Sequence, residues 1–342
     1  MTYANDAHRQ ATEMLARIIA TPSKTGDEAA VVDLIVDELA KLGLKAERHE
    51  RNLVVTLTKG EGPTLYLNTH MDTVPAAAGY TRDPFAPDIE DGKLYGLGSN
   101  DAGAALVSMA LATHQLAQRE DWQGTLKLLY VVEEEVSGRN GAEKLVAEIG
   151  LGDAAIVGEP TALNICIAQK GLIVMDAVNR GLSCHAANAY RVEHKNAILE
   201  ALEDANAVHA LTFAESDTYL GPTTLNVTKI KGGTATNSIP DLCEWAIDAR
   251  INPAQTLEGV LEAVRQATKA EVNPRSLRLH PLRTDPSQAV VRAAQAARPA
   301  SELFGSDTMS DAVFFRAGPV IKCGPGITEM SHKPDEYVEL RW

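Results

Sequence analysis

The hydrophobic pattern of residues 1–160 alternates between helical and strand periods. Apolar side chains at helical spacing predict amphipathic helices over residues 4–20 and from the capping-box spacing at Thr25–Glu28 to Gly43. Further helices are predicted over residues 104–116 and 141–149. Short apolar or alternating runs predict five strands, over residues 46–49, 53–57, 65–67, 125–132 and 154–157. This alternation is typical of an α/β domain with buried parallel strands.

The pattern changes in the second half of the chain. It predicts a strand, a helix, two strands and a helix over residues 172–178, 196–211, 225–230, 243–251 and 257–267. This β-α-β-β-α order is that of a ferredoxin-like sandwich. A chain of 342 residues is longer than most single domains, so we expect two domains.

Side chains that bind metals follow three of the five predicted strands. His70 and Asp72 follow the third strand, Glu133–Glu135 the fourth and Glu159 the fifth. Because ligands bind at the carboxyl ends of strands in open α/β sheets, these side chains are expected to form a site. One histidine with several carboxylates suits zinc, cobalt or manganese. More carboxylates than one ion needs indicate two ions that share one of them.

Each feature has a simpler interpretation when it is taken alone. His70 and Asp72 could be a hydrogen-bonded histidine–aspartate pair that caps a strand. Three adjacent glutamates could lie on a solvated loop, but directly after a buried strand their repulsion favours a nearby cation or a general base. A second histidine ligand has two candidates, His185 and His332.

Residues 80–96 are polar and interrupted by proline and glycine, so we expect a loop over this site. The following turn, Gly96–Gly98, precedes a helix and could bind phosphate. It lacks the third glycine of a dinucleotide site, and Asp101 would repel a phosphate. Asp101 is then either a helix N-cap or, beside a cation, a ligand.

Composition excludes several classes of partner. The net charge is 32 − 46 = −14 without a basic run, so we expect neither nucleic acid nor a membrane as a partner. No segment resembles a signal peptide or a membrane span. The cysteines are scattered, which argues against disulfides and thiolate zinc sites and favours the cytoplasm: Cys166, Cys184, Cys243 and Cys323.

Seven motifs in order resemble the M20 family of di-zinc amidohydrolases, and within it the acetylornithine deacetylase branch. They are His70-Met-Asp72, Gly96-Leu-Gly-Ser-Asn-Asp101, Glu134-Glu135, Gly158-Glu159-Pro-Thr161, Gly233-Thr-Ala-Thr-Asn237-Ser-Ile-Pro240, Ser310-Asp311-Ala312 and His332-Lys-Pro-Asp-Glu336. Two departures stand beside them. Ala102-Gly103-Ala104 replaces a frequent Met-Lys-Gly, and Glu133 takes the place of a common aspartate.

The resemblance implies two divalent metal ions, Zn²⁺ first, with Co²⁺ or Mn²⁺ as alternatives. One ion is held by His70 and Glu159, and the other by Glu135 and His332. Asp101 bridges them. Two further roles are implied: Asp72 orients His70, and Glu134 is the general base.

The resemblance also implies the domain plan. A catalytic α/β domain of the zinc-exopeptidase type with a mostly parallel central sheet comprises residues 1–170 and 280–342. A smaller ferredoxin-like domain, residues 171–279, is inserted and forms a homodimer. In the implied mechanism an activated water attacks an amide carbonyl, and Glu134 passes the proton to the leaving amine. His185 from the second subunit stabilises the oxyanion.

The resemblance implies that a substrate carboxylate is bound by Asn237, Arg250 and the turn containing Gly324 and Gly326. Arg250 could instead pair with Asp248. The expected substrate is N-acetylornithine, which yields ornithine and acetate in arginine biosynthesis. A succinylated diamine, acetylcitrulline and acetyl-lysine are alternatives, and a dipeptide is less favoured. A nucleotide-dependent oxidoreductase and a non-catalytic binding module are the remaining classes, because no serine-hydrolase elbow occurs.

Overall fold

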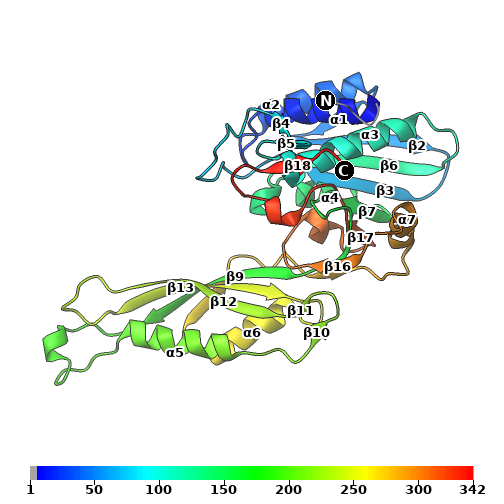
Figure 1. Ribbon diagram of the computed structural model, residues 1–342. Helices are drawn as coiled ribbons and strands as arrows, with labels where there is room; N and C mark the ends of the chain where they lie inside the picture. Colours follow the sequence, from blue (N-terminus) through cyan, green and yellow to red (C-terminus); the bar gives the residue numbers. More distant parts are fainter. Residues whose placement is uncertain (1–5, 342) are drawn as a thin grey trace. The chain divides into compact units, whose positions relative to one another are not determined.

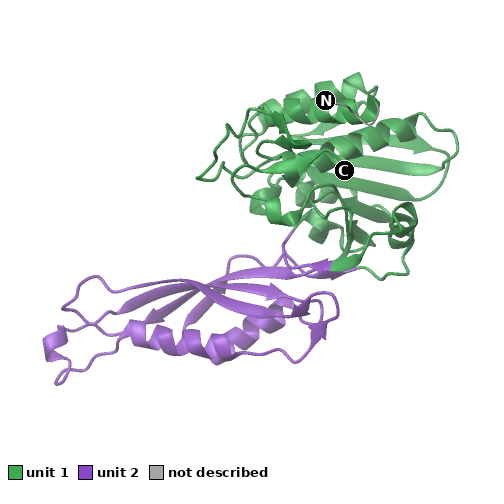
Figure 2. Ribbon diagram, in the orientation of Figure 1, with its two compact units in different colours: residues 1–167, 284–304, 310–342 green, residues 168–283, 305–309 purple. Residues whose placement is uncertain are grey.

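The computed structural model describes residues 6–341, which form two compact units (Figure 2). Unit 1 contains residues 1–167, 284–304 and 310–342, and unit 2 contains residues 168–283 and 305–309. Unit 2 therefore interrupts unit 1 in the sequence. Among the described residues, no helix combines the length and apolar character needed to cross a bilayer.

Unit 1 is organised around a nine-stranded sheet with the order β1-β2-β6-β3-β7-β17-β8-β15, in which β16 also pairs with β8. Every strand of this sheet except β15 has residues in unit 1. The four central strands β6, β3, β7 and β17 are parallel, whereas pairs nearer both edges are antiparallel. The predicted α/β class is confirmed, with a mixed sheet. The strands are β1 Ala46–His49, β2 Asn52–Lys59, β3 Thr64–His70, β6 Gly124–Val131, β7 Ala154–Val157, β8 Ile165–Gln169, β15 Leu282–Arg283, β16 Leu303–Ser306 and β17 Val320–Lys322.

Three helices form one hydrophobic core with the sheet: α1 (Asp6–Ile19), α2 (Ala29–Lys41) and α3 (Ala104–Ala117). α1 and α2 bury one apolar stripe each. α3 is apolar on nearly every side, as expected for a helix enclosed by its neighbours. Unit 1 also contains α4 (Ala142–Ile149) and α7 (Ala289–Ala297). The sequence pattern predicted α4 but not α7.

Two local predictions were wrong. The helix α2 begins at Ala29, and no capping box forms. The Thr25 hydroxyl donates to Asp72 instead, and a Glu28 oxygen accepts from the Gly26 N–H. Residues 80–96 are not only a loop, because two short strands, β4 (Asp88–Glu90) and β5 (Lys93–Tyr95), pair with β18 (Tyr337–Glu339).

Unit 2 has the β-α-β-β-α order predicted from the sequence, followed by a sixth element, β14. Its sheet runs β12-β13-β9-β14, all antiparallel, which is the order of a ferredoxin-like sandwich. Figure 1 shows both helices on the same face of this sheet. The elements are β9 Gly171–Arg180, α5 Ala197–Ala210, β12 Thr224–Gly232, β13 Leu242–Ile251, α6 Leu257–Ala267 and β14 Glu271–Pro274, with a small pair β10 Ser216–Asp217 and β11 Gly221–Pro222.

Candidate metal centre

The parallel strands of unit 1 deliver the predicted side chains to one edge of the sheet. His70 is the last residue of β3, Glu134 and Glu135 form a short turn after β6, and Glu159 follows β7. Because β3, β6 and β7 are parallel neighbours, their carboxyl ends lie side by side. The strand pattern in the sequence thus places three separate segments at one site.

Two groups of side chains at this edge could hold a metal ion. The first is His70, Asp101 and Glu159, and the second is Asp101, Glu135 and His332. Within each group, the candidate ligand atoms all lie within 4.8 Å of one another. Asp101 belongs to both groups, so its two carboxylate oxygens can serve two neighbouring ions.

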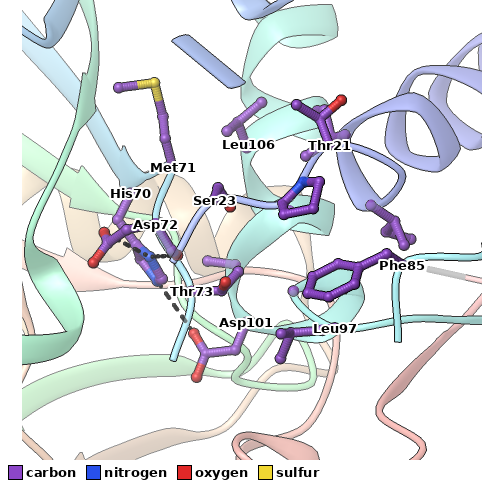
Figure 3. Close-up of a pocket in the computed structure, with 16 residues that line it drawn as sticks. Thr21, Ser23, His70, Met71, Asp72, Thr73, Phe85, Leu97, Asp101 and Leu106 are labelled. Atoms are coloured by element: carbon purple, nitrogen blue, oxygen red, sulfur yellow. Dashed lines mark hydrogen bonds and ion pairs between the residues drawn. The ribbon is translucent and has the colours of Figure 1, made fainter. Parts of the chain in front are cut away.

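One hydrogen bond shows that the Nδ1 atom of His70 carries a hydrogen. Its Nδ1 lies 2.9 Å from the backbone oxygen of Asp72, which can only accept, so Nδ1 carries the hydrogen. Its Nε2 lies 3.2 Å from Oδ1 of Asp101. Burial opposes a charge on the ring, but the hydrogen bonds with Asp101 and Asp72 raise the pKa of His70 well above its usual value, so without a cation Nε2 donates to Asp101. Figure 3 shows the ring between Asp72 and Asp101, at one side of a small pocket that Ser23 and Thr73 also line. A cation bound here would replace the Nε2 proton.

Asp72 holds the turn that carries Glu134 and Glu135. Its carboxylate accepts from the Thr25 hydroxyl at 2.7 Å and from the backbone N–H groups of Glu134 and Glu135 at 3.1 and 3.3 Å. Burial opposes its charge, but the His70 ring and these donors lower the pKa of Asp72 below its usual value. Asp72 is therefore an ionised carboxylate that fixes its neighbours.

His332 belongs to the second group and lies on a loop. Its Nε2 lies 2.8 Å from Oε2 of Glu135 and 3.8 Å from Oδ2 of Asp101. The Glu135 side chain is 5% exposed and the His332 ring 52% exposed. The hydrogen bond to Glu135 raises the pKa of His332 to about 9.

The buried carboxylates of the site repel one another. Burial, followed by the charge of Asp101, raises the pKa of Glu159 to about 8. Burial, followed by the charge of Glu159, raises the pKa of Glu134 well above its usual value. Among the described residues, the Oε1 atoms of Glu135 and Glu159 are buried and have no hydrogen-bond partner. Crowded carboxylates with unused oxygens fit a site built for divalent cations.

Glu133 points to a different set of partners from the two glutamates that follow it. It has a left-handed backbone (φ 61°), and its carboxylate accepts hydrogen bonds from Arg51 and from the side chain and backbone N–H of Asn140. Arg51 also pairs with Glu28. Glu133 therefore ties the start of the turn to Arg51 and Asn140, whereas Asp72 holds the two residues that follow.

A buried polar cluster lies on the same sheet beside Glu159. Asn68 and Lys322 occupy the same row of the sheet, on either side of Val157, and Asn68 donates to Asp311 at 3.4 Å. Lys322 is 4% exposed, and its charge acts to lower the pKa of Glu159. Asp311 was part of a recognised motif, but the sequence assigned no role to it.

The predicted substrate-binding glycines have a packing role in unit 1. A Cβ on Gly324 would lie 2.6 Å from the backbone oxygen of Glu159. Gly326 has a φ of +87°, and a Cβ there would lie 2.4 Å from Oδ1 of Asn100. Both positions require glycine because the chain passes close to the segments that carry Glu159 and Asp101.

In unit 2, two of the predicted residues lie together. The N–H of Ala186 donates to the backbone oxygen of Asn237 at 2.9 Å, and His185 forms a β-bridge with Ser238. The side chain of His185 is exposed. Arg250 donates through two nitrogens to Asp248, at 2.8 and 3.1 Å, which is the structural pairing that the sequence left open for it.

Comparisons with known proteins give consistent matches. The sequence profile described as Peptidase family M20/M25/M40 matches residues 66–342. A succinyl-diaminopimelate desuccinylase of Parvibaculum lavamentivorans is 32% identical over 95% of this chain and 89% of its own length. An acetylornithine deacetylase of Edwardsiella ictaluri is 31% identical over 94% and 91%. An aminopeptidase from Bacillus cereus superposes with a TM-score of 0.81 at 23% identity, covering 98% of this chain and 94% of that one.

Proposed function

The chain belongs to Peptidase family M20/M25/M40, and on that premise we propose that it hydrolyses the amide bond of an N-acyl amino acid with two divalent cations. Membership confirms the family resemblance carried by the motifs, and it makes the protein a metallohydrolase. One observation carries the proposal: Asp101 belongs to both groups of candidate ligands. A carboxylate shared in this way suits a pair of neighbouring cations.

The proposed ligands divide by group. His70 and Glu159 hold one cation, Glu135 and His332 hold the other, and Asp101 contacts both. Imidazole and carboxylate donors suit Zn²⁺, with Co²⁺ or Mn²⁺ as alternatives. When bound, the cations supply positive charge that polarises the amide carbonyl and makes the attacking water more acidic.

Glu134 is the proposed general base and acid. Its backbone N–H is held by Asp72, so the turn that carries its carboxylate is fixed relative to His70. Glu134 takes a proton from the attacking water and then donates it to the leaving nitrogen. A carboxyl group whose pKa lies above its usual value can both accept and return that proton near neutral pH.

Unit 2 is proposed to contribute recognition and to form a homodimer. β12 is an edge strand of its sheet and is largely exposed, so it could pair with a second copy. His185 of the second subunit would then stabilise the oxyanion, and Asn237, Arg250 and the Gly324–Gly326 turn would bind the substrate carboxylate. For Arg250 this requires that the guanidinium exchange Asp248 for the substrate.

The mutation His185→Ala tests the role of unit 2. We expect turnover to fall by orders of magnitude, about 100-fold or more, while the bound metal content stays unchanged. His194 lies in the same segment and is also exposed, so His194→Ala is the matched control and should keep wild-type turnover. Normal turnover in the His185→Ala protein would contradict this role.

The preferred substrate is N-acetylornithine. A desuccinylase activity is the second candidate, because a desuccinylase matches this chain about as well as a deacetylase does, at 32% and 31% identity. Each substrate presents a free carboxylate and an amide on an amino acid. The two substrates differ in the acyl group, acetyl or succinyl, and in the amino acid. The succinyl group and the second amino-acid end of diaminopimelate each add a carboxylate for the site to bind.

A substrate panel tests the proposed function. Release of free amine is measured from acetylornithine, acetylcitrulline, acetyl-lysine and succinyl-diaminopimelate, using Zn²⁺-loaded, Co²⁺-loaded and chelated protein. We expect the fastest release from acetylornithine, with activity lost on chelation and restored by adding metal. Undiminished activity after exhaustive chelation, or no release from any N-acyl amino acid, would refute the proposal.

A further inference from the structure

The segment that carries His332 is fastened to the segment that carries Asp101 by one buried glutamate. Glu336 is 1% exposed. Its carboxylate accepts from three backbone donors of one turn: Oε2 from Gly98 at 3.2 Å, and Oε1 from Asn100 and Asp101, each at 2.9 Å. Its own backbone oxygen accepts from the Gly96 N–H at 2.9 Å. One residue therefore occupies most of the backbone donors of the turn that ends at Asp101.

Asn100 fastens the same two segments from the other side. Its Oδ1 accepts from the Ile327 N–H at 2.8 Å, and its Nδ2 donates to the Ile327 oxygen at 3.1 Å and to the Ser331 hydroxyl at 3.3 Å. Asn100 is fully buried. Asn100 and Glu336 thus bracket the segment 327–336, at whose centre His332 lies.

The bracket holds the backbone on both sides of His332, whose ring is held by its hydrogen bond to Glu135. The ring is half exposed, and the backbone has a left-handed φ of 62°, as does that of Asp335 at 55°. Non-glycine residues adopt such a backbone only where the neighbouring structure imposes it. The position of the His332 backbone, and with it the reach of the ring toward Glu135 and Asp101, therefore depends on where residues 327 and 336 are fastened.

We propose that Glu336 is a positioning residue for the second ligand group, fixing the distance between the shared Asp101 and His332. This inference rests on the proposed two-cation function. Glu336 belongs to neither group of candidate ligands, and its carboxylate is engaged by backbone N–H groups. It acts by holding the Asp101 backbone and the His332 loop together, so its loss should weaken the group of Asp101, Glu135 and His332 more than the group that contains His70.

A carboxylate suits this position for a geometric reason. Three N–H donors converge on it, and a carboxylate offers only acceptors. In Glu336→Gln, an NH₂ group would face the N–H of Gly98, while Oε1 could still serve Asn100 and Asp101. In Glu336→Ala, all three buried donors lose their partner.

The test compares Glu336→Ala and Glu336→Gln with Asp335→Asn in the full chain. Asp335 lies on the same loop but bonds Thr81 and Arg82 instead of the Asp101 turn, and asparagine tolerates its left-handed backbone. Zn²⁺ binding to the chelated proteins is titrated calorimetrically. Amide hydrogen exchange of residues 97–103 and 327–335 is measured on the metal-free proteins.

We expect Glu336→Ala to bind one equivalent like the wild type and the other about 10-fold to 100-fold more weakly, with faster exchange in both segments. Glu336→Gln should show the same selective loss of affinity to a smaller extent. If the alanine variant does not fold, the glutamine variant tests the positioning role instead. Asp335→Asn should match the wild type. Wild-type binding of both equivalents in a folded Glu336 variant, or an equal loss of both, would overturn the inference.

Failure of the proposed function gives a different result. A wild-type chain that binds fewer than two cations, or that releases no amine, contradicts the two-cation hydrolase. The exchange measurement needs neither cation nor substrate. If exchange of the two segments in the Glu336 variants equals that of the wild type, the positioning role is refuted independently.

Discussion

His70 and His332 both face Asp101, but the His70 ring is 1% exposed and the His332 ring is 52% exposed. His70 ends a central strand of the sheet, and its Nδ1 is bonded to the backbone of Asp72. His332 lies on a loop with a left-handed backbone, held at its two ends. One ligand group is thus part of the rigid sheet, and the other is completed by a loop.

This difference separates two ways of placing a metal ligand. On a strand end, the sheet register sets the position of the side chain, and the hydrophobic core keeps it there. On a loop, the position depends on a few polar contacts with distant segments, so removing one contact has a local effect. We therefore expect the two groups to respond differently to mutation and to pH.

The largest effect is expected for Glu134, which belongs to neither group. Glu134→Gln removes the proposed proton carrier, and turnover should fall about 10²-fold to 10⁴-fold. Both cations should remain bound, as measured by metal analysis of the dialysed protein. Glu61→Gln, a change at an exposed glutamate away from the site, is the control. Loss of metal in the Glu134→Gln protein would assign this residue to one of the groups.

The pH dependence of metal binding should distinguish the groups. Cations bind the deprotonated forms of Glu159 and His332, whose pKa values are about 8 and about 9. Below these values protons compete, so apparent affinity should fall as the pH falls, by up to about tenfold per pH unit for each proton displaced. Burial opposes a charge on His70, but hydrogen bonds with Asp101 and Asp72 also raise the pKa of His70 well above its usual value. Cation binding to the His70 group must therefore displace protons from both His70 and Glu159, and the affinity of this group should depend more steeply on pH than that of the His332 group.

Calorimetry in buffers of different ionisation enthalpy measures this proton release. At pH 7 we expect protons to leave the protein for each equivalent of Zn²⁺ bound. Zn²⁺ binding with no proton release at pH 7 would contradict the assignment of Glu159 and His332 as ligands.

The stability of the metal-free protein should separate the two histidines. His70→Ala leaves the backbone oxygen of Asp72 without its buried donor, which should cost about 1–3 kcal/mol in the free energy of unfolding. His332→Ala removes a half-exposed side chain together with its hydrogen bond to Glu135, and should cost less, about 0.5–1 kcal/mol. Denaturant unfolding of the chelated proteins measures both. Equal destabilisation by the two changes would refute the distinction between a sheet ligand and a loop ligand.

The smallest effect is expected for Thr25→Val. It removes the hydroxyl donor to Asp72 and keeps the shape of the side chain, at a cost of about 1 kcal/mol. The turn of Glu134 and Glu135 keeps its two backbone bonds to Asp72, so kcat should fall only a few-fold. Thr58→Val, at an exposed strand position, is the control. A loss of activity as large as that of Glu134→Gln would show that Asp72 depends on Thr25.

Much of the site could be predicted from the sequence because it is built on strand ends. Apolar runs locate β3, β6 and β7, and the polar residues that follow them include His70, Glu133–Glu135 and Glu159. The choice of Glu135 among the three glutamates came from the family resemblance. The ferredoxin-like order of unit 2 was also predicted, since its strands and helices have clear periods. The short strand β14 and the pairs around β4 and β5 were missed because such short, polar strands have no run long enough to recognise.

The residues that support the ligands could not be predicted. Thr25 reaches Asp72 across 47 positions, Arg51 reaches Glu133 across 82, and Glu336 reaches Asn100 across 236. Thr25 also fits a local capping box, which the tertiary bond to Asp72 overrides. Glu336 belonged to a recognised motif, but only the fold reveals the three donors that it accepts.

The position of β17 has a consequence for the order in which the protein can be completed. β7 and β8 are neighbours in sequence order, yet β17 lies between them in the sheet. In a nascent chain that ends before residue 320, β7 can therefore pair with β3 on one side but has no β17 to pair with on the other. The same last segment brings His332 and Glu336. Closing the sheet and completing the second ligand group therefore both require residues 320–336.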